Sequence, residues 1–188
     1  MEYKNIINPT ELLEFMDENI KYGFVDRENK IHEPSDSFDK ECRKNWRLSS
    51  PERLIEKGYG HCYDQVELER DWFTKNGYNV KTFFSIFELD YDNPYTTHTF
   101  LVYEDNNKFY LFEHADYENR GIWEFSSYNE AVKAQIKRSV TLNRKYHNLK
   151  DDELSSLCVY EYNKPKYNIS MNRFIDDVIY NRTNTNTK

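Results

Sequence analysis

Cysteine is scarce in this chain, and its scarcity argues against two classes of small protein. The 188 residues include only three cysteines, Cys42, Cys62 and Cys158. Their odd number and wide spacing argue against a disulfide framework. They also lack the close Cys-x-x-Cys pairs of a structural zinc site. Each cysteine therefore has to be explained singly, as a core residue or as a reactive thiol.

A metal centre built from histidine and cysteine is not expected either. His61, Cys62, His98, His114 and Cys158 could be drawn together as a set of ligands. However, two adjacent residues such as His61 and Cys62 rarely both point at one ion. The chain also contains no GxxxxGK[ST] phosphate loop, no GxGxxG pattern and no HExxH zinc motif. We therefore expect no metal and no other cofactor.

Long apolar runs and an excess of positive charge are both missing. No run approaches the length that spans a membrane, and residues 1–4 lack the apolar core of a signal peptide. The chain has 26 Lys and Arg against 33 Asp and Glu, which gives a net charge of -7. A broad nucleic-acid-binding face needs clustered Lys and Arg. We therefore expect a cytoplasmic protein whose partners are neither membranes nor nucleic acids.

The residues that are present fit one globular domain. The composition is 38% hydrophobic and 31% charged, and 16 tyrosines add apolar area. The length suffices for one domain with a proper core and is short for two. We expect residues 1–180 to form a single domain and the polar residues 181–188 to be a disordered tail.

Helix and strand signals alternate along this domain. Capping residues and apolar spacing predict helices over residues 9–21, 51–57, 62–75, 128–145 and 169–179. Apolar runs and turn residues predict strands over residues 78–89, 97–103, 108–113, 117–125 and 157–162. A turn is predicted at Asp90–Tyr95. The polar residues 23–48 are predicted to be short extended pieces and loop that lie over the site.

Cys62 stands at the start of the predicted helix over residues 62–75. Its helical spacing to Val66 and Phe73 turns the cysteine side chain inward. A helix N-terminus favours a thiolate, so Cys62 is a candidate nucleophile. For a lone cysteine the competing interpretation is a small core residue.

The predicted hairpin over residues 97–113 supplies a base and an acid. A two-residue turn at Asp105-Asn106 would place His98 directly opposite Glu113, with Cβ atoms about 4.5–5.5 Å apart. The same face carries the apolar residues Phe100, Val102, Phe109 and Leu111. We therefore expect this face to pack on the core and to point His98 and Glu113 towards Cys62.

Other registers and other residues stay open at this point. A three-residue turn would place Phe112 or His114 opposite His98. Asp116 is an alternate acid, three residues beyond Glu113. Taken singly, His98 fits a satisfied core histidine, and Glu113 fits a surface carboxylate. A purely structural role for all three members of the set needs three coincidences of position, so we favour a catalytic set.

These segments resemble the transglutaminase-like cysteine enzymes. Residues 60–65, GHCYDQ, resemble the nucleophile motif of that superfamily, residues 98–103, HTFLVY, its histidine strand, and residues 108–113, KFYLFE, its acid strand. The resemblance covers about residues 46–116. It implies an α+β fold with a papain-like core, in which a Cys-bearing helix packs on an antiparallel sheet with flanking helices. The superfamily usually has Asp at the place of Glu113 and an aromatic residue soon after the histidine, for which Phe100 would serve.

The resemblance implies acyl transfer through a thioester on Cys62. His98 would transfer the proton, and Glu113, with Asp116 as the alternate acid, would orient His98. Trp46 and Tyr63 are implied as oxyanion or substrate-binding residues. The expected substrate is a protein, a peptide or a small amide, and hydrolysis is favoured over cross-linking.

Two other functions compete with this prediction. An arylamine acetyltransferase uses a similar core with acetyl-CoA, but the chain is short for that family and lacks the Arg-Gly-Gly lead-in to the nucleophile. The protein could also be a non-catalytic module that binds peptide or glycan through its Tyr and Trp side chains. The chemistry of Cys62 discriminates them: acetylation by acetyl-CoA favours the first, and an unreactive thiol favours the second.

Overall fold

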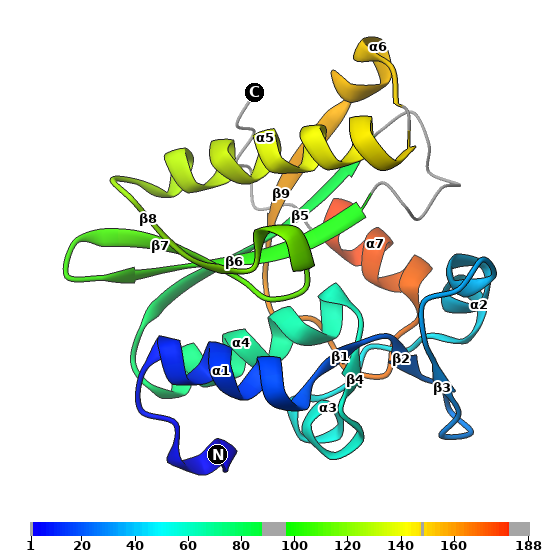
Figure 1. Cartoon of the computed structure of the whole chain (residues 1–188), viewed down its shortest axis with the longest axis horizontal. Coiled ribbons are helices and arrows are strands. Elements are labelled where there is room, and N and C mark those ends of the chain that lie inside the picture. The colour runs from blue at the N-terminus through cyan, green and yellow to red at the C-terminus, as the bar shows by residue number, and fades with distance from the viewer. Residues whose placement is uncertain (1, 88–96, 148, 181–188) are drawn as a thin grey trace.

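A five-stranded antiparallel sheet forms the centre of the protein in this computed structural model, which describes residues 2–87, 97–147 and 149–180. Its strand order is β8-β7-β6-β5-β9. The strands are β5 (Asn79–Phe87), β6 (Thr97–Asp105), β7 (Lys108–Glu113), β8 (Gly121–Phe125) and β9 (Leu157–Tyr162). Figure 1 shows α5 (Tyr128–His147) along one face of the sheet, and α4 (Cys62–Lys75) and α1 (Pro9–Asn19) on the other. The predicted α+β class is confirmed.

Smaller elements surround this sheet. The short strand β1 (Lys21–Tyr22) pairs in parallel with β4 (Tyr59–Gly60), and β2 (Phe24–Val25) pairs antiparallel with β3 (Ile31–His32). The remaining elements are η1 (Tyr3–Asn5), α2 (Phe38–Asn45), α3 (Pro51–Lys57), η3 (Tyr117–Asn119), α6 (Asp151–Leu154) and α7 (Met171–Tyr180). The parallel β1–β4 pair places Tyr22 beside the segment that leads into α4.

The predicted helices begin where their capping residues indicate. The Asn8 side chain accepts a hydrogen bond from the backbone N–H of Glu11 at 2.9 Å, and Pro9 is the first residue of α1. Ser50 caps α3 in the same way, and Gly58 ends that helix in the left-handed conformation at φ 69°. Local sequence chemistry therefore determines these helix ends.

Part of the segment over residues 23–48 is helical, so the expectation of a loop there is wrong for α2. This helix buries only Phe38 and Cys42, which lie one turn apart, and its other six positions are charged or polar. Two apolar positions are too few for a periodicity that stands out in the sequence. The short helix α6 has only one buried residue, Leu154, and it was not predicted for the same reason.

The hairpin between β6 and β7 turns one residue later than predicted. Asn106 and Asn107 occupy the tip with φ of 49° and 61°, so Asp105 pairs with Lys108 and Leu101 with Phe112. Positive φ at both central residues is the signature of a type I′ turn, and asparagine tolerates it well. The predicted register is therefore wrong by two residues. Because side chains alternate with a period of two, the shift leaves His98 and Glu113 on one face of the hairpin.

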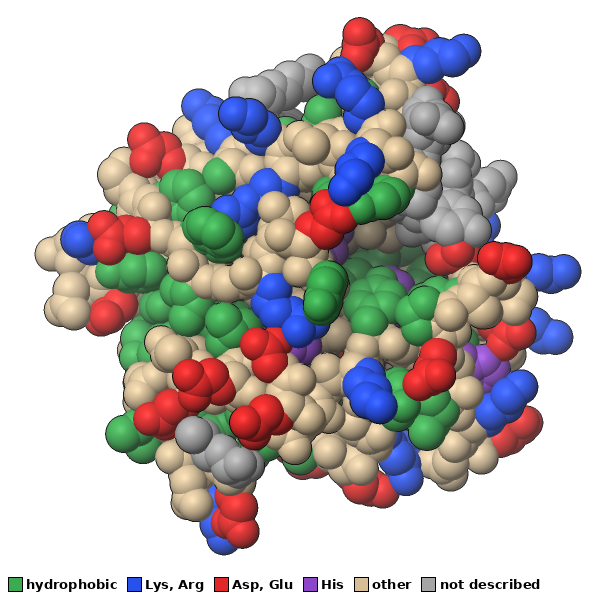
Figure 2. All heavy atoms as spheres, viewed as in Figure 1, with side chains coloured by type: hydrophobic (Ala, Val, Ile, Leu, Met, Phe, Trp, Pro, Cys, Tyr) green, Lys and Arg blue, Asp and Glu red, His purple; other side chains and the backbone are tan. Residues whose placement is uncertain are grey.

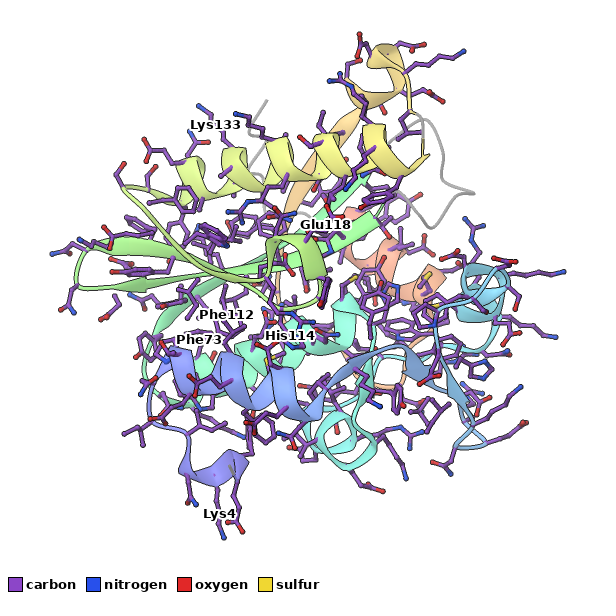
Figure 3. The ribbon with its side chains drawn as sticks, in the orientation of Figure 1. Lys4, Phe73, Phe112, His114, Glu118 and Lys133 are labelled. Carbon is purple, nitrogen blue, oxygen red and sulfur yellow. The ribbon has the colours of Figure 1, made fainter. Side chains whose placement is uncertain are left out.

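One face of the sheet packs on α4. Leu101, Tyr103 and Phe112 lie in the same buried cluster as Phe73 of α4. The rings of Phe73 and Phe112 meet edge to face with centroids 5.3 Å apart, and Figure 3 shows them between the helix and the strands. This packing joins the helix that carries Cys62 to the two strands of the hairpin.

The other face of the sheet packs on α5. Phe100 and Val102 of β6 lie in a second buried cluster with Val132 of α5. The His98 ring stacks on Phe100 with centroids 6.4 Å apart, so His98 belongs to this face. The expectation that this face packs on the core is confirmed, and the helix that covers it is α5. His98 still reaches Cys62, because it lies at the end of β6 next to the start of α4.

Two further predictions concern membrane-spanning helices and the segments at residues 90–95 and 181–188. None of the described helices combines the length and the apolar character that crossing a membrane requires. The turn predicted at Asp90–Tyr95 and the tail predicted over residues 181–188 lie outside the described residues.

Candidate active site

The N-terminus of α4 is held in place by Asp64, the third residue of the helix. Its carboxylate accepts hydrogen bonds from the backbone N–H of His61 at 2.8 Å and of Ser49 at 2.7 Å. It also accepts one from the indole N–H of Trp46 at 2.8 Å. Burial raises the pKa of Asp64 to about 6, although these three donors favour the carboxylate. Asp64 therefore holds His61, which precedes the cysteine, and the segment at Ser49, which leads into α3.

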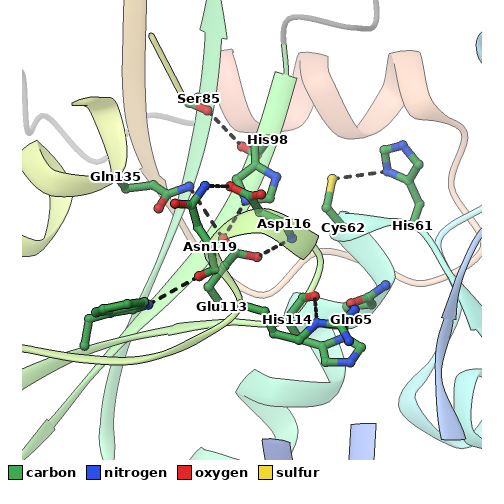
Figure 4. Close-up of polar contacts among 12 residues, drawn as sticks. His61, Cys62, Gln65, Ser85, His98, Glu113, His114, Asp116, Asn119 and Gln135 are labelled. Atoms are coloured by element: carbon green, nitrogen blue, oxygen red, sulfur yellow. Dashed lines mark hydrogen bonds and ion pairs between the residues drawn. The ribbon is translucent and has the colours of Figure 1, made fainter. Parts of the chain in front are cut away.

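The thiol of Cys62 lies next to the imidazole of His61. The Sγ and Nδ1 atoms are 3.2 Å apart, within hydrogen-bond distance for sulfur (Figure 4). The other ring nitrogen, Nε2, lies 3.0 Å from the hydroxyl of Tyr22. The ring is also stacked on Tyr63, with centroids 4.9 Å apart. His61 is thus held on both edges and on one face, with Nδ1 directed at the sulfur.

His98 approaches the same thiol from the end of β6. Its Nε2 lies 2.8 Å from Oε2 of Glu113, which leaves Nδ1 as the nitrogen that can exchange a proton with the thiol. Glu113 is 2% exposed and accepts further hydrogen bonds from the backbone N–H of Asp116 at 2.9 Å and from the side chain of Gln135 at 3.5 Å. Figure 4 shows this network beside Cys62. The carboxylate is therefore fixed from several sides, and it orients the imidazole.

The charges in the site favour a thiolate facing imidazolium. Burial opposes ionisation of Cys62, but His61 and then His98 outweigh it and hold the pKa of the thiol well below its usual range. Burial likewise opposes a charged His98, but Glu113 and then Cys62 raise its pKa well above its usual range. The pKa of His61 is also raised, because Cys62 outweighs burial there. The two imidazoles compete for one thiol proton, since a positive charge on one ring disfavours a positive charge on the other.

A second carboxyl group lies beneath this network on α4. Glu69 is 1% exposed and lies seven residues, or about two helical turns, beyond Cys62. Burial, followed by the negative charge of Glu113, raises the pKa of Glu69 well above its usual range. The shift favours the uncharged form of Glu69, which would not compete with Glu113 for His98.

An open cavity of about 870 Å³ adjoins the site. His98, Asp116, Gln135 and Tyr22 line it, together with apolar and aromatic residues such as Ile20, Leu142 and Tyr146. Figure 2 shows the hollow in the middle of the viewed face, with hydrophobic and histidine side chains inside it. The side chain of His98 is 19% exposed, whereas Cys62 is 2% exposed. A ligand in the cavity therefore meets the imidazole first and the sulfur behind it.

The structure brings together the three residues predicted as nucleophile, base and acid, which are Cys62, His98 and Glu113. Asp116, the alternate acid, bonds to Asn119 at 2.8 Å and gives its backbone N–H to Glu113. Among the described contacts it forms neither a hydrogen bond nor an ion pair with His98. The geometry therefore favours Glu113 over Asp116 as the partner of the imidazole.

Trp46 and Tyr63 do not have the roles that the resemblance implied. The indole N–H of Trp46 is taken by Asp64, and the Trp46 side chain is fully buried. The hydroxyl of Tyr63 bonds to Thr97 at 2.6 Å, and its ring packs on Phe174 with centroids 4.7 Å apart. Both residues are core residues that support the helix start, so neither faces the cavity as an oxyanion donor or a substrate contact.

Two residues of the site were not assigned a role from the sequence, His61 and Tyr22. His61 directly precedes a helix whose third residue is Asp64, which is a capping pattern, and this signal could have placed its ring near Cys62. Tyr22 lies in a two-residue strand with no pattern of its own, and it reaches His61 only through the β1–β4 pairing. Contacts of that kind depend on tertiary structure.

His114 has a separate environment on the far side of the hairpin. Its Nδ1 lies 2.6 Å from Oε1 of Gln65, and its Nε2 lies 3.2 Å from a carboxylate oxygen of Asp17. Burial, followed by the charge of Arg120, lowers the pKa of His114 to about 3. Within the described ranges no group of three or more His, Cys, Asp or Glu side chains is arranged to hold a metal ion. His114 thus joins α4 to the hairpin as a neutral hydrogen-bonding residue.

The chemistry available at this place is nucleophilic attack with proton transfer. A thiol at a helix N-terminus that favours the thiolate, an imidazole held by a buried carboxylate and an adjoining cavity are the parts that covalent acyl transfer needs.

Comparisons with family models, with curated proteins and with solved structures find no match to this chain. The roles of the site residues therefore rest on their own geometry.

Proposed function

We propose that the protein is a cysteine-dependent acyl-transfer enzyme, similar to the transglutaminase-like enzymes with their papain-like core, that cleaves amide or peptide bonds. The observation that carries the proposal is the position of the Cys62 thiol between two imidazoles, one of which is held 2.8 Å from a buried carboxylate. A cysteine that served only as a core residue would not need these neighbours. Cys42, which is equally buried, has none of them.

In the proposed reaction Cys62 attacks the carbonyl carbon of the substrate, and its proton passes to His98. His98 returns that proton to the leaving amine, which departs as the thioester forms. Water then attacks the thioester carbonyl and gives one proton to His98. The C–S bond breaks, the acid is released, and His98 returns the proton to the sulfur. Glu113 holds His98 in the tautomer that accepts the proton and stabilises the imidazolium that results. The backbone N–H of Cys62 at the start of α4 is one donor for the developing oxyanion.

The cavity favours an acyl group that is partly apolar. Two of its lining residues, Asp17 and Arg120, are paired at 2.5 Å, and a third, Glu118, is paired with Lys145 at 3.0 Å, while Lys21 and Asp116 line it without a described ion pair. Glu118 lines the cavity, and Figure 3 shows it on η3. A charged substrate would compete with these pairs, whereas a peptide or small amide with an apolar side chain would not.

A non-catalytic binding module is the second candidate, and one observation favours it. The thiol is 2% exposed, and Cys62 is not among the residues that line the cavity. Catalysis requires a substrate carbonyl to reach the sulfur past His98. A module that only binds peptide or glycan would need no access to the sulfur and would keep an inert thiol.

Trapping of the acyl-enzyme tests the proposal. Wild-type protein is incubated with a panel of activated amides and short peptides, and the peptide containing Cys62 is examined by mass spectrometry for the mass of the acyl group. We expect a thioester on Cys62 and a loss of turnover of at least about 1,000-fold in Cys62→Ser. Cys42→Ser is the matched control and should keep full turnover. Unchanged turnover in Cys62→Ser would refute the assignment, and the absence of any adduct would favour the binding module.

A further inference from the structure

A second cavity, of about 420 Å³, shares no lining residue with the cavity beside the candidate active site. It lies between the end of β2, the segment that leads into α3 and residues 167–168 before α7. Three arginines line it, Arg27, Arg47 and Arg53. It continues into a groove of about 560 Å³ along α2, and the two share Asp26, Arg27 and Arg47. The groove adds three lysines, Lys30, Lys40 and Lys44.

This concentration of positive charge stands out in a chain with a net charge of -7. Among the described residues, three carboxylates line the two spaces, Asp26, Glu28 and Glu41. Two of them are already engaged by one imidazole: Asp26 lies 2.8 Å from Nε2 of His32, and Glu41 lies 2.5 Å from its Nδ1. Across the described part of the chain, none of the six cations forms an ion pair with a carboxylate. Carboxylates act on them only from a longer distance, as Glu41 does on Lys30 and Glu56 on Arg53.

Two of the guanidinium groups are fixed by neutral partners. Arg53 donates to the backbone oxygen of Asp26 at 2.9 Å. Arg47 donates to the backbone oxygens of Trp46 at 2.6 Å and of Lys44 at 3.3 Å. A guanidinium has five N–H donors, so each retains donors for a ligand. Carbonyl oxygens hold these side chains in place without cancelling their charge.

The third arginine, Arg27, adds repulsion to Arg47. Burial, followed by the positive charge of Arg27, lowers the pKa of Arg47. Like charges are held near one another at a cost unless an anion lies between them. Planar guanidinium groups match the oxygens of phosphate in a bidentate way and bind it better than lysine does. Ser50 and Asn168 supply neutral polar groups on the same wall.

We propose that the cleft lined by Arg27, Arg47 and Arg53 binds a small soluble anion that carries at least two linked phosphate groups. One phosphate lies among the three arginines, and the second extends into the groove towards Lys30, Lys40 and Lys44. A single phosphate uses only the arginine end and binds more weakly. The anion site does not involve Cys62, so the test of anion binding is separate from the test of the proposed acyl-transfer activity.

Calorimetric titration of the full-length protein with pyrophosphate and with inorganic phosphate tests this site. We expect saturable binding of one pyrophosphate per chain, weaker binding of phosphate, and loss of affinity as salt is raised. Arg27→Gln removes an exposed charge that forms no described hydrogen bond, so the fold should be kept. We expect it to weaken pyrophosphate binding by about tenfold or more. Cys62→Ser should bind as wild type does.

Lys133→Gln is the matched control, because it removes the same charge from the outer side of α5, where Figure 3 shows Lys133 away from the cleft. It should change the affinity by less than about twofold. Equal losses in Arg27→Gln and Lys133→Gln would show that the anion responds only to the overall charge and would overturn the proposal. Absence of saturable pyrophosphate binding at low salt would overturn it as well.

Discussion

Cys42 and Cys62 are buried to nearly the same degree, yet their thiols have opposite surroundings. Cys42 is 1% exposed and Cys62 is 2% exposed. Burial, followed by the negative charge of Asp64, raises the pKa of Cys42 well above its usual range. His61 and His98 outweigh burial at Cys62 and lower its pKa. Burial alone therefore does not make a cysteine inert or reactive, because the charges beside the thiol decide it.

The position of each cysteine in its helix accounts for part of this difference. Cys42 lies in the interior of α2, whereas Cys62 is the first residue of α4, where the free backbone N–H groups favour a negative sulfur. α2 has 8 residues and α4 has 14, and both are rich in charge. The contrast in pKa between the two thiols arises from the place of each cysteine in its helix and from the two histidines beside Cys62.

The larger expected effect is on the catalytic rate, and it concerns Glu113, whose charge makes His98 unlike an ordinary buried histidine. Glu113→Gln removes the charge that raises the pKa of His98, and we expect the catalytic rate to fall by about 100-fold or more. Asp116→Asn is the matched control, and the rate should change by less than about tenfold because Asp116 bonds to Asn119 rather than to His98. Steady-state rates of both variants on one substrate provide the measurement. A greater loss in Asp116→Asn would assign the acid to Asp116 instead.

A smaller effect is expected where the thiol meets His61. His61→Asn places a good helix-capping residue at this position but removes the imidazole 3.2 Å from the sulfur. The pKa of Cys62 should rise, so the thiolate fraction at pH 6 should fall by about tenfold, as read from ultraviolet thiolate absorbance. Tyr22→Phe, which removes only the hydroxyl at Nε2, should lower it by about threefold. An unchanged thiolate fraction in His61→Asn would leave His98 as the group that ionises Cys62.

Local chemistry made much of the fold predictable from the sequence. Asn8, Ser50 and Ser127 cap helices through their own side chains, so these helix starts follow from residues three or four positions apart. The face shared by His98 and Glu113 was also predictable, because it depends only on the parity of the hairpin register. A shift of two residues preserves that parity.

The rest depended on contacts that sequence spacing does not encode. The observed turn at Asn106-Asn107 and the predicted turn at Asp105-Asn106 differ by one position. The backbone twist of the hairpin, which requires positive φ at both turn residues, decides between them. Trp46 donates to Asp64 because the segment before α3 folds back on α4, which no local pattern indicates. The pairing of Cys62 with His61 depends on side-chain rotamers of adjacent residues. Sequence reasoning therefore identified the residue types in the site better than their partners.

The most direct measurement is the rate of iodoacetamide alkylation of each cysteine as a function of pH, read by peptide mass spectrometry on the native protein. A thiol with a lowered pKa is already ionised in mild acid. We therefore predict that the Cys62 rate is nearly constant from about pH 6 to 9 and falls only at lower pH. Cys42, whose pKa is raised, should stay unreactive across the range, and the half-buried Cys158 provides a reference rate. A Cys62 rate that climbs with pH up to about 8.5 like an ordinary thiol, or no reaction at Cys62 at all, would contradict this account.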